Sequence, residues 1–425
     1  MTALPIRVSG TTGNPRSSVA KDESPKRRAV SSAEPTVPAL LPVYSRFPAE
    51  FVRGEGVELI DANGKRYLDF ASGIAVNALG YGDAGIASAI EDALATGLIH
   101  TSNLYDTKPG RELAAELVAR SFADSVFFCN SGAEANEAAF KFARRWAGTL
   151  GPAKREIVAL RGSFHGRLFG SLAATDRPGY RAPFRPLAGG ISICERDLQA
   201  LADRLDPETA AAVILEPVQG ESGIRLLDAG FLRELRALTR ERRVALVFDE
   251  VQCGLGRTGR LFAYEHSGVE PDLLTLAKPL AGGLPMGAVL MTADVARTIQ
   301  PGDHATTFGG GPLVASVARY VLRRVGSDTM LASVRQNGEW LGARLQRLVE
   351  QKQVARSVRG AGYMWGLDTH RRAKEVVSAA FEAGLLIVSA GDWTIRLLPP
   401  LVSSRDDLSR GLAILEDILA APAGA

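Results

Sequence analysis

Val244-Ala245-Leu246-Val247-Phe248 is an unbroken apolar run, and the acid Asp249 follows it at once. A second run, Leu273 to Ala277, is apolar except for Thr275 and is followed by Lys278. Runs that are apolar almost throughout are typical of strands covered on both faces, as in a parallel sheet. Such sheets carry their chemistry outside the carboxyl ends of the strands. The two runs therefore predict a carboxylate and an amine at one sheet edge.

This pair of groups suits an enzyme that uses pyridoxal 5'-phosphate. The lysine would form a Schiff base with the cofactor's aldehyde, while the carboxylate would keep the ring nitrogen protonated so that the ring draws in electrons. Burial would lower the pKa of such a lysine and so favour its reactive neutral form. In the alternative interpretation, Asp249 is a loop acid just past the sheet, and Lys278 is a solvated residue before Pro279.

Size and charge narrow the class of protein. A chain of 425 residues exceeds the range of a single hydrophobic core, so two domains are expected. No apolar stretch approaches the roughly 18 residues that span a bilayer, so we expect no membrane segment. Residues 1–40 hold six basic and three acidic residues, which accounts for the whole net charge of +3. The remaining chain lacks the basic excess of a nucleic-acid-binding protein.

Cysteine and histidine patterns argue against disulfides and metal sites. The three cysteines form no Cys-x-x-Cys pair, and the five histidines include no i,i+4 pair. A reducing compartment follows, and we expect a cytoplasmic protein. The Ser- and Arg-rich tail resembles an organelle transit peptide in part, but Asp22, Glu23 and Glu34 count against that alternative.

The predicted organisation has four parts. Residues 1–40 are expected to be a disordered tail, 41–74 and 313–425 to form one smaller domain, and 75–312 to form the large domain. Strand and helix patterns alternate in the large domain, which predicts an α/β fold with a mostly parallel sheet. The expected strands are 126–128, 157–160, 212–215, 244–248 and 273–276, and the expected helices are 112–120, 134–146, 313–324 and 341–350.

Two further segments follow predicted strands. In the first, Ser131 is a good helix N-cap, Glu134 would complete a capping box, and the free N–H groups near Gly132 favour a phosphate. An ordinary capped helix explains this segment equally simply. In the second, Phe164 could stack on a planar cofactor, and Arg167 could hold a carboxylate. The alternative there is a core Phe and a surface Arg.

Other candidates are weaker on their own. Glu216 closes an apolar strand, the hydroxyl-rich loop at Thr306 and Thr307 could bind phosphate, and Arg396 is a charge inside an apolar strand. Arg396 could instead face water on an edge strand. The stretch Gly254–Gly259 matches Gly-x-Gly-x-x-Gly, which keeps a nicotinamide-dependent oxidoreductase as a remote alternative. The pattern opens no helix-like sequence, so we expect it not to bind a dinucleotide.

Five motifs in order resemble the class III aminotransferases of fold type I, and among these the acetylornithine aminotransferases. The resemblance covers roughly residues 42–420 and implies a large domain with a seven-stranded, mostly parallel sheet flanked by helices, plus a smaller α+β domain. The motifs are Ala71–Gly80, Asn130–Asn136, Phe164–Arg167, Phe248–Gly254 and Leu276–Lys278. Three positions depart from the family's usual residues, namely Tyr81, Ala305 and Gly311.

The resemblance also implies residue roles. Lys278 would bind the cofactor and move the proton, Asp249 would pair with the ring nitrogen, and Gln252 would contact the ring oxygen. Phe164 would stack on the ring. The remaining cofactor-binding residues would be Ser131, Gly132, Ala133 and His165, together with Thr307 from the other subunit of a homodimer whose active sites lie at the interface.

The implied substrates are N2-acetylornithine and 2-oxoglutarate, which becomes glutamate. Acetylornithine reacts through its distal amine, so its distant carboxylate would lie on Arg167, with Thr306 near the substrate across the interface. Glutamate reacts through its α-amine, so its α-carboxylate needs Arg396, which we expect Glu216 to mask until glutamate arrives. Succinylornithine, succinyl-diaminopimelate, ornithine or a carrier-bound lysine are alternative amino donors, and a catalytically silent relative is a further possibility.

Overall fold

The computed structural model describes residues 39–351 and 353–421. The chain divides after Pro48, and every element named below belongs to the unit that begins at Ala49. The predicted disordered tail, residues 1–40, lies almost wholly outside the described residues. No helix in the described ranges is long and apolar enough to cross a membrane.

A seven-stranded sheet forms the centre of the large domain, as expected from the sequence. Neighbouring strands pair in parallel except β12, which is antiparallel to both of its neighbours, so the prediction of a mostly parallel sheet is confirmed. The expected strands omitted β6 and β12, because one is short and half-buried and the other begins in a Gly-Ala pair. In spatial order the strands are β4 (Ser125–Cys129), β12 (Gly287–Met291), β11 (Leu273–Leu276), β10 (Ala245–Asp249), β7 (Ala210–Leu215), β5 (Glu156–Leu160) and β6 (Ile191–Cys194).

The helices are longer than the apolar pattern suggested. The expected helix 341–350 is the end of a single helix that begins at Asp328. The α-helices are α1 (Ser72–Ala75), α2 (Ala84–Ala95), α3 (Lys108–Val118), α4 (Gly132–Leu150), α5 (Phe169–Ala173), α6 (Pro178–Arg181), α7 (Leu198–Arg204), α8 (Ala229–Glu241), α9 (Ala293–Ala296), α10 (Pro312–Val325), α11 (Asp328–Glu350), α12 (Ala373–Glu382) and α13 (Arg405–Ala420), and the 3-10 turns are η1 (Ala182–Phe184), η2 (Ala263–His266) and η3 (Lys278–Ala281).

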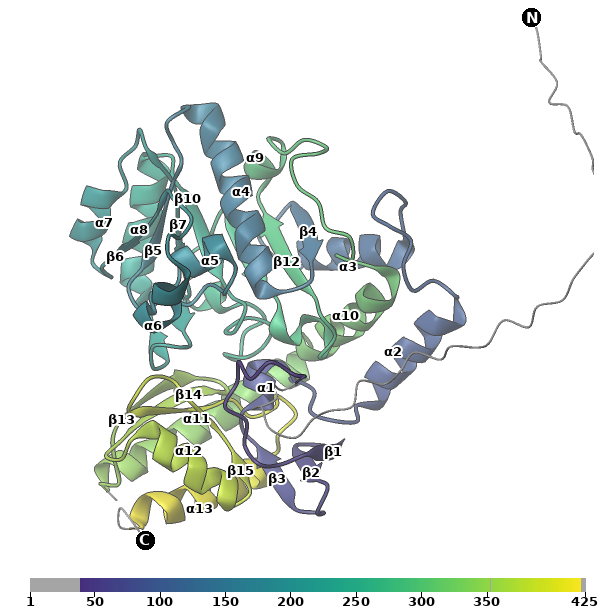
Figure 1. Ribbon diagram of the computed structural model, residues 1–425, viewed down its shortest axis with the longest axis vertical. Helices are drawn as coiled ribbons and strands as arrows, with labels where there is room; N and C mark the ends of the chain where they lie inside the picture. Colours follow the sequence, from purple (N-terminus) through teal and green to yellow (C-terminus); the bar gives the residue numbers. More distant parts are fainter. Residues whose placement is uncertain (1–38, 352, 422–425) are drawn as a thin grey trace, which may run out of the picture. The chain divides into compact units, whose positions relative to one another are not determined.

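Both faces of the large sheet are buried, which explains its continuous apolar runs. In β10, Ala245 and Val247 pack in one cluster with residues of α4, whereas Leu246 and Phe248 pack in a second cluster with residues of α8. Figure 1 shows α4 (blue) lying along the sheet. Because successive side chains of a strand point to opposite faces, Asp249 follows Val247 on the face that α4 covers.

The smaller domain contains two four-stranded sheets, of order β1-β2-β3-β15 and β13-β14-β17-β16. The parallel pairing of β15 with β3 joins the segment before Ala71 to the C-terminal part of the chain, as the sequence suggested. Its strands are β1 (Phe51–Glu55), β2 (Glu58–Asp61), β3 (Arg66–Asp69), β13 (Ala355–Ala361), β14 (Met364–Thr369), β15 (Leu385–Leu386), β16 (Val388–Ser389) and β17 (Thr394–Leu397), and a separate ribbon pairs β8 (Val218–Gln219) with β9 (Arg225–Leu226).

Candidate active site

A cavity of about 430 Å³ lies where β4, β5, β7, β10 and β11 end. It brings together residues that are far apart in the sequence, because parallel strands present their carboxyl ends at one edge. Ten of the predicted site residues line it, namely Ser131, Gly132, Ala133, Phe164, His165, Arg167, Glu216, Asp249, Gln252 and Lys278.

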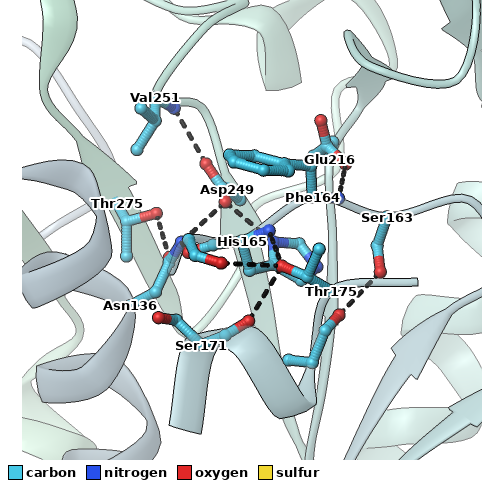
Figure 2. A network of polar contacts seen from close by, with 12 residues as sticks. Asn136, Ser163, Phe164, His165, Ser171, Thr175, Glu216, Asp249, Val251 and Thr275 are labelled. Atoms are coloured by element: carbon cyan, nitrogen blue, oxygen red, sulfur yellow. Dashed lines mark hydrogen bonds and ion pairs between the residues drawn. The ribbon is translucent and has the colours of Figure 1, made fainter. Parts of the chain in front are cut away.

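Asp249 lies at the centre of a buried polar network (Figure 2). Its Oδ2 accepts hydrogen bonds from Asn136 Nδ2 and His165 Nδ1, each at 2.8 Å, and its Oδ1 accepts one from the Val251 N–H at 3.0 Å. An ionised carboxylate offers about four acceptor positions, so Oδ1 retains one. His165, predicted to contact the cofactor, bonds to Asp249 and has a fully buried side chain.

Lys278 follows β11 by two residues, beside the strand that carries Asp249. Burial, together with the positive charge of Arg396, lowers the pKa of Lys278 to about 8. Its backbone φ of 29° lies in the left-handed region, which is uncommon for a residue with a side chain. Strain of this kind persists where the surrounding structure enforces it, and it clusters at active sites.

The N-terminus of α4 forms another wall of the cavity. Ser131 Oγ accepts from the Glu134 N–H at 3.2 Å, as predicted, but Glu134 Oε2 accepts from the Asn130 N–H at 2.7 Å. The second half of the expected capping box is therefore wrong, because Glu134 reaches one residue beyond the cap. Among the described residues, the N–H groups of Gly132 and Ala133 have no hydrogen-bond partner, as the first turn of a helix requires.

Gly132 also has a steric reason to be glycine. A Cβ atom at this position would lie 2.7 Å from Cγ1 of Val251, which is closer than packed atoms approach. The absence of a side chain therefore lets the first turn of α4 lie against the segment that follows β10.

Arg396 lies on β17 and is almost completely buried. Its Nη1 is 2.9 Å from Glu221 Oε1 and 2.8 Å from Gln252 Oε1. Burial would raise the pKa of Glu221, but Arg396 and Lys278 outweigh this effect, and the pKa lies below its ordinary value.

The prediction that Glu216 pairs with Arg396 is wrong. Glu216 accepts from the N–H groups of Phe164 and Gly220, at 2.9 and 3.1 Å. It directly follows β7 and stays at the sheet edge, whereas the chain passes through β8 before Glu221 reaches Arg396. Burial raises the pKa of Glu216.

Arg167 lies at the exposed side of the cavity. The central carbon of its guanidinium is 3.5 Å from the ring centroid of Tyr180 and 5.8 Å from that of Phe164. The sequence offered no signal for Tyr180, which belongs to the short helix α6. The contact holds a cation at the mouth of the site while leaving its donors free for a carboxylate.

Thr306 and Thr307 do not line this cavity; they line a second hollow of about 760 Å³. Thr306 is nevertheless linked to the first site, because its Oγ1 accepts from Asn130 Nδ2 at 3.1 Å. Large apolar side chains nearby are strongly exposed, with Leu104 at 87%, Tyr105 at 73% and Phe308 at 65%. Such exposure is typical of a surface that another chain covers.

The glycine stretch Gly254–Gly259 does not open a helix; turns follow it as far as the 3-10 turn η2. Arg257 within it is fully buried and donates to the carbonyl oxygens of Tyr363 and Pro399. The stretch therefore braces the fold and lacks the helix N-terminus that a dinucleotide requires.

The residues of the cavity fit pyridoxal 5'-phosphate. The two unpaired N–H groups at the start of α4 suit its phosphate. The remaining acceptor position of Asp249 suits a protonated ring nitrogen, and the amine of Lys278 suits the aldehyde. These three groups come from α4, β10 and the turn after β11.

Comparisons with known proteins agree with this geometry. Residues 42–419 match the family model described as aminotransferase class-III. A protein from Gloeobacter violaceus named acetylornithine aminotransferase is 47% identical over 381 residues, which are 89% of this chain and 94% of that protein. A succinylornithine transaminase from Yersinia pseudotuberculosis is 43% identical over 88% of this chain and 93% of its own. The crystal structure of N-acetylornithine aminotransferase from Stenotrophomonas maltophilia matches with a TM-score of 0.77 at 37% identity, over 89% of this chain and 96% of that chain.

Proposed function

The chain belongs to the class-III aminotransferases, which depend on pyridoxal 5'-phosphate, and from this premise we propose that it is an acetylornithine aminotransferase. It would transfer the δ-amino group of N2-acetylornithine to 2-oxoglutarate, giving N-acetylglutamate 5-semialdehyde and glutamate, as a step of arginine biosynthesis. The observation that carries the proposal is the meeting of Asp249 and Lys278 from adjacent strands in one cavity.

The residues divide the work of holding the cofactor. The N–H groups of Gly132 and Ala133, with Ser131 at the helix start, would hold the phosphate, and Phe164 would lie against the ring. Gln252 would contact the ring oxygen. When bound, the cofactor supplies an electron sink for the bond that breaks at the substrate carbon. The amine of Lys278, whose pKa is about 8, can then accept and return the substrate proton near neutral pH.

Two different substrates must use this one site in turn. Acetylornithine presents its reacting amine far from its carboxylate, which Arg167 would hold at the mouth. Glutamate presents an α-carboxylate close to the reacting amine, and Arg396 would hold it there. Since Arg396 is buried, it needs an anionic partner when glutamate is absent, and Glu221 supplies that partner at 2.9 Å. We therefore assign the masking role to Glu221 in place of Glu216.

A homodimer completes the proposed site. Thr307, and Thr306 beside it, lie outside the main cavity, next to the exposed side chains of Leu104, Tyr105 and Phe308. Covering these apolar groups with a second copy of the chain would bring the threonines of one subunit toward the cofactor of the other. The three free cysteines are consistent with a reducing compartment, and we propose the cytoplasm.

Kinetics with a panel of amino donors tests the substrate. Acetylornithine should give the highest kcat/KM among acetylornithine, succinylornithine, succinyl-diaminopimelate, free ornithine and an acyl-carrier-bound lysine, with 2-oxoglutarate as the common acceptor. Succinylornithine is the second candidate, because relatives of that name are 43% identical to this chain. A strong preference for unacylated ornithine would overturn the assignment.

A further inference from the structure

We propose that Asn136, held by Thr275, is a positioning residue that aims the carboxylate of Asp249 at the ring nitrogen of the cofactor. The inference rests on the proposed function, because Asp249 has this role only in an enzyme that binds pyridoxal 5'-phosphate. Asn136 lies on α4, Thr275 on β11 and Asp249 at the end of β10, so three elements meet at one amide (Figure 2).

The contacts leave Asn136 a single orientation. Its Nδ2 lies 2.7 Å from the carbonyl oxygen of His165 and 2.8 Å from Asp249 Oδ2. A backbone carbonyl can only accept, so the NH2 group must be the one that faces it. The Oδ1 atom of Asn136 then points to Thr275 Oγ1, at 2.8 Å, and the Thr275 hydroxyl must donate. The two acceptors therefore fix which side of the amide meets Asp249, and Thr275 anchors the opposite side.

The same logic fixes His165. Its Nδ1 lies 2.8 Å from Asp249 Oδ2, which as a carboxylate oxygen accepts, so Nδ1 carries a proton. Its buried Nε2 has no hydrogen-bond partner among the described residues, and a proton there would be unsatisfied. With Asn136 and His165 both on Oδ2 and the Val251 N–H on Oδ1, the carboxylate cannot rotate without losing a bond. Its free acceptor position stays on Oδ1.

Thr275 and Asn136 are buried, so their hydrogen bond does more than fill space. Thr275 has no exposed surface and Asn136 is 1% exposed, in a strand and a helix face that are otherwise apolar. A valine at position 275 would fill the same space without a buried hydroxyl, and neighbouring strands use such residues. A buried hydroxyl such as that of Thr275 is costly unless it forms a hydrogen bond, and the Asn136 amide is the group with which it forms one.

The test compares Thr275→Val with Thr275→Ser, which keeps the hydroxyl, in the intact holoenzyme. Thr275→Val leaves Asn136 Oδ1 as a buried acceptor without a donor, so the amide loses one of its three anchors and holds Asp249 less firmly. We expect the affinity for pyridoxal 5'-phosphate to fall by about tenfold or more, with kcat reduced more than the KM for the amino donor. The pH midpoint of the visible absorbance of the bound cofactor should rise. A ring nitrogen that is protonated less firmly repels a second proton less, so the nitrogen that Lys278 contributes keeps its proton to higher pH. Thr275→Ser should retain the wild-type values.

Thr239→Val is the matched structural control. Thr239 is also fully buried, and its hydroxyl donates to the Arg236 carbonyl oxygen at 3.0 Å on α8, outside the site. Both Val variants should lower the melting temperature, but only Thr275→Val should change the cofactor affinity and the pH midpoint. Should Thr275→Val fail to fold, Asn136→Ala tests the same claim, since it removes both Nδ2 contacts.

The outcomes separate the two proposals. A wild-type protein that neither binds pyridoxal 5'-phosphate nor transaminates would overturn the proposed function. A wild-type protein that does both, with Thr275→Val or Asn136→Ala matching Thr239→Val in cofactor affinity and pH midpoint, would overturn the positioning role alone.

Discussion

The floor and the mouth of the cavity are built on different principles. At the floor, Asp249 is held by hydrogen bonds from Asn136 on α4, His165 in the loop between β5 and α5, and Val251 just after β10. The two arginines proposed to bind substrate carboxylates, called the mouth below although Arg396 is buried, have exchangeable partners: Glu221 pairs with Arg396, and the ring of Tyr180 contacts Arg167. The floor has one arrangement that satisfies its donors and acceptors, whereas an incoming carboxylate can replace either partner at the mouth.

This difference matches what a two-substrate transaminase requires. The cofactor must keep one orientation through both half-reactions, so rigidity at the floor benefits both equally. The two amino donors place their carboxylates at different distances from the reacting amine, so the mouth must change its ion pairs. Mutations at the floor should therefore affect both half-reactions alike, and mutations at the mouth should separate them.

Lys278 belongs to both regions, because its charge interacts with Asp249 as well as with Arg396 and Glu221. Lys278→Ala should give the largest effect, a loss of turnover by about 10⁴-fold or more in both half-reactions, since it removes the amine that binds the cofactor and moves the proton. Lys278→Arg is the control that retains a cation but no reactive amine, and it should be equally inactive. Single-turnover absorbance measurements give both rates, and turnover within tenfold of wild type would contradict the assignment.

Asp249→Asn tests the floor. The amide has nearly the same shape but no charge, so we expect both half-reactions to slow by a similar factor of about 10² to 10³. Glu250→Gln is a matched control, because Glu250 is the next residue, is buried and accepts from the N–H groups of Ala263 and Tyr264. Burial raises the pKa of Glu250 to about 8, so the neutral glutamine resembles its state at pH 7. Selective slowing of one half-reaction by Asp249→Asn would break the distinction between floor and mouth.

Arg396→Ala tests the mouth. It should slow the glutamate half-reaction by about 10²-fold, because a charged hydrogen-bonding partner of the α-carboxylate is lost, and it should slow the acetylornithine half-reaction much less. Rapid mixing of the cofactor-loaded variant with each amino donor separates the two rates. An equal loss of rate in both half-reactions would contradict the proposal that Arg396 exchanges Glu221 for the glutamate carboxylate.

The pH dependence of cofactor uptake should change by about tenfold between pH 7 and pH 9. Burial and Arg396 hold the pKa of Lys278 near 8. Below that value most of the amine is protonated and cannot attack the aldehyde, so the rate rises with pH and levels off above about pH 8. In Arg396→Ala the rise should move to higher pH, because the positive charge that lowers the pKa is gone. Stopped-flow absorbance after mixing apoenzyme with pyridoxal 5'-phosphate gives the profile, and a pH-independent rate would contradict the role of Lys278.

Glu221→Gln should have the smallest effect. It unmasks Arg396, so glutamate should compete better against acetylornithine, with a change of a few-fold in the ratio of their kcat/KM values. Glu216→Gln is the control, since Glu216 accepts from two backbone N–H groups and does not touch Arg396. A larger change in that ratio for Glu216→Gln would return the masking role to the residue that the sequence first suggested.

The sequence was sufficient to locate Asp249 and Lys278, because a charge directly after a buried apolar run is visible without coordinates. It could not decide between Glu216 and Glu221, since the pairing depends on the path that the chain takes after β7. The hydrogen bond from Thr275 to Asn136 joins residues 139 positions apart. They lie on a strand and a helix, and no local sequence pattern predicts that these two elements are in contact. Thr275 was nevertheless visible as the one polar residue in its run.

Reduction of the holoenzyme with borohydride, followed by peptide mapping, tests the central claim most directly. Borohydride fixes the cofactor on the amine that holds it. The account predicts a single pyridoxyl-labelled peptide, modified at Lys278, with the label absent from Lys278→Ala. A label on another lysine, or no label on a yellow, active protein, would contradict it.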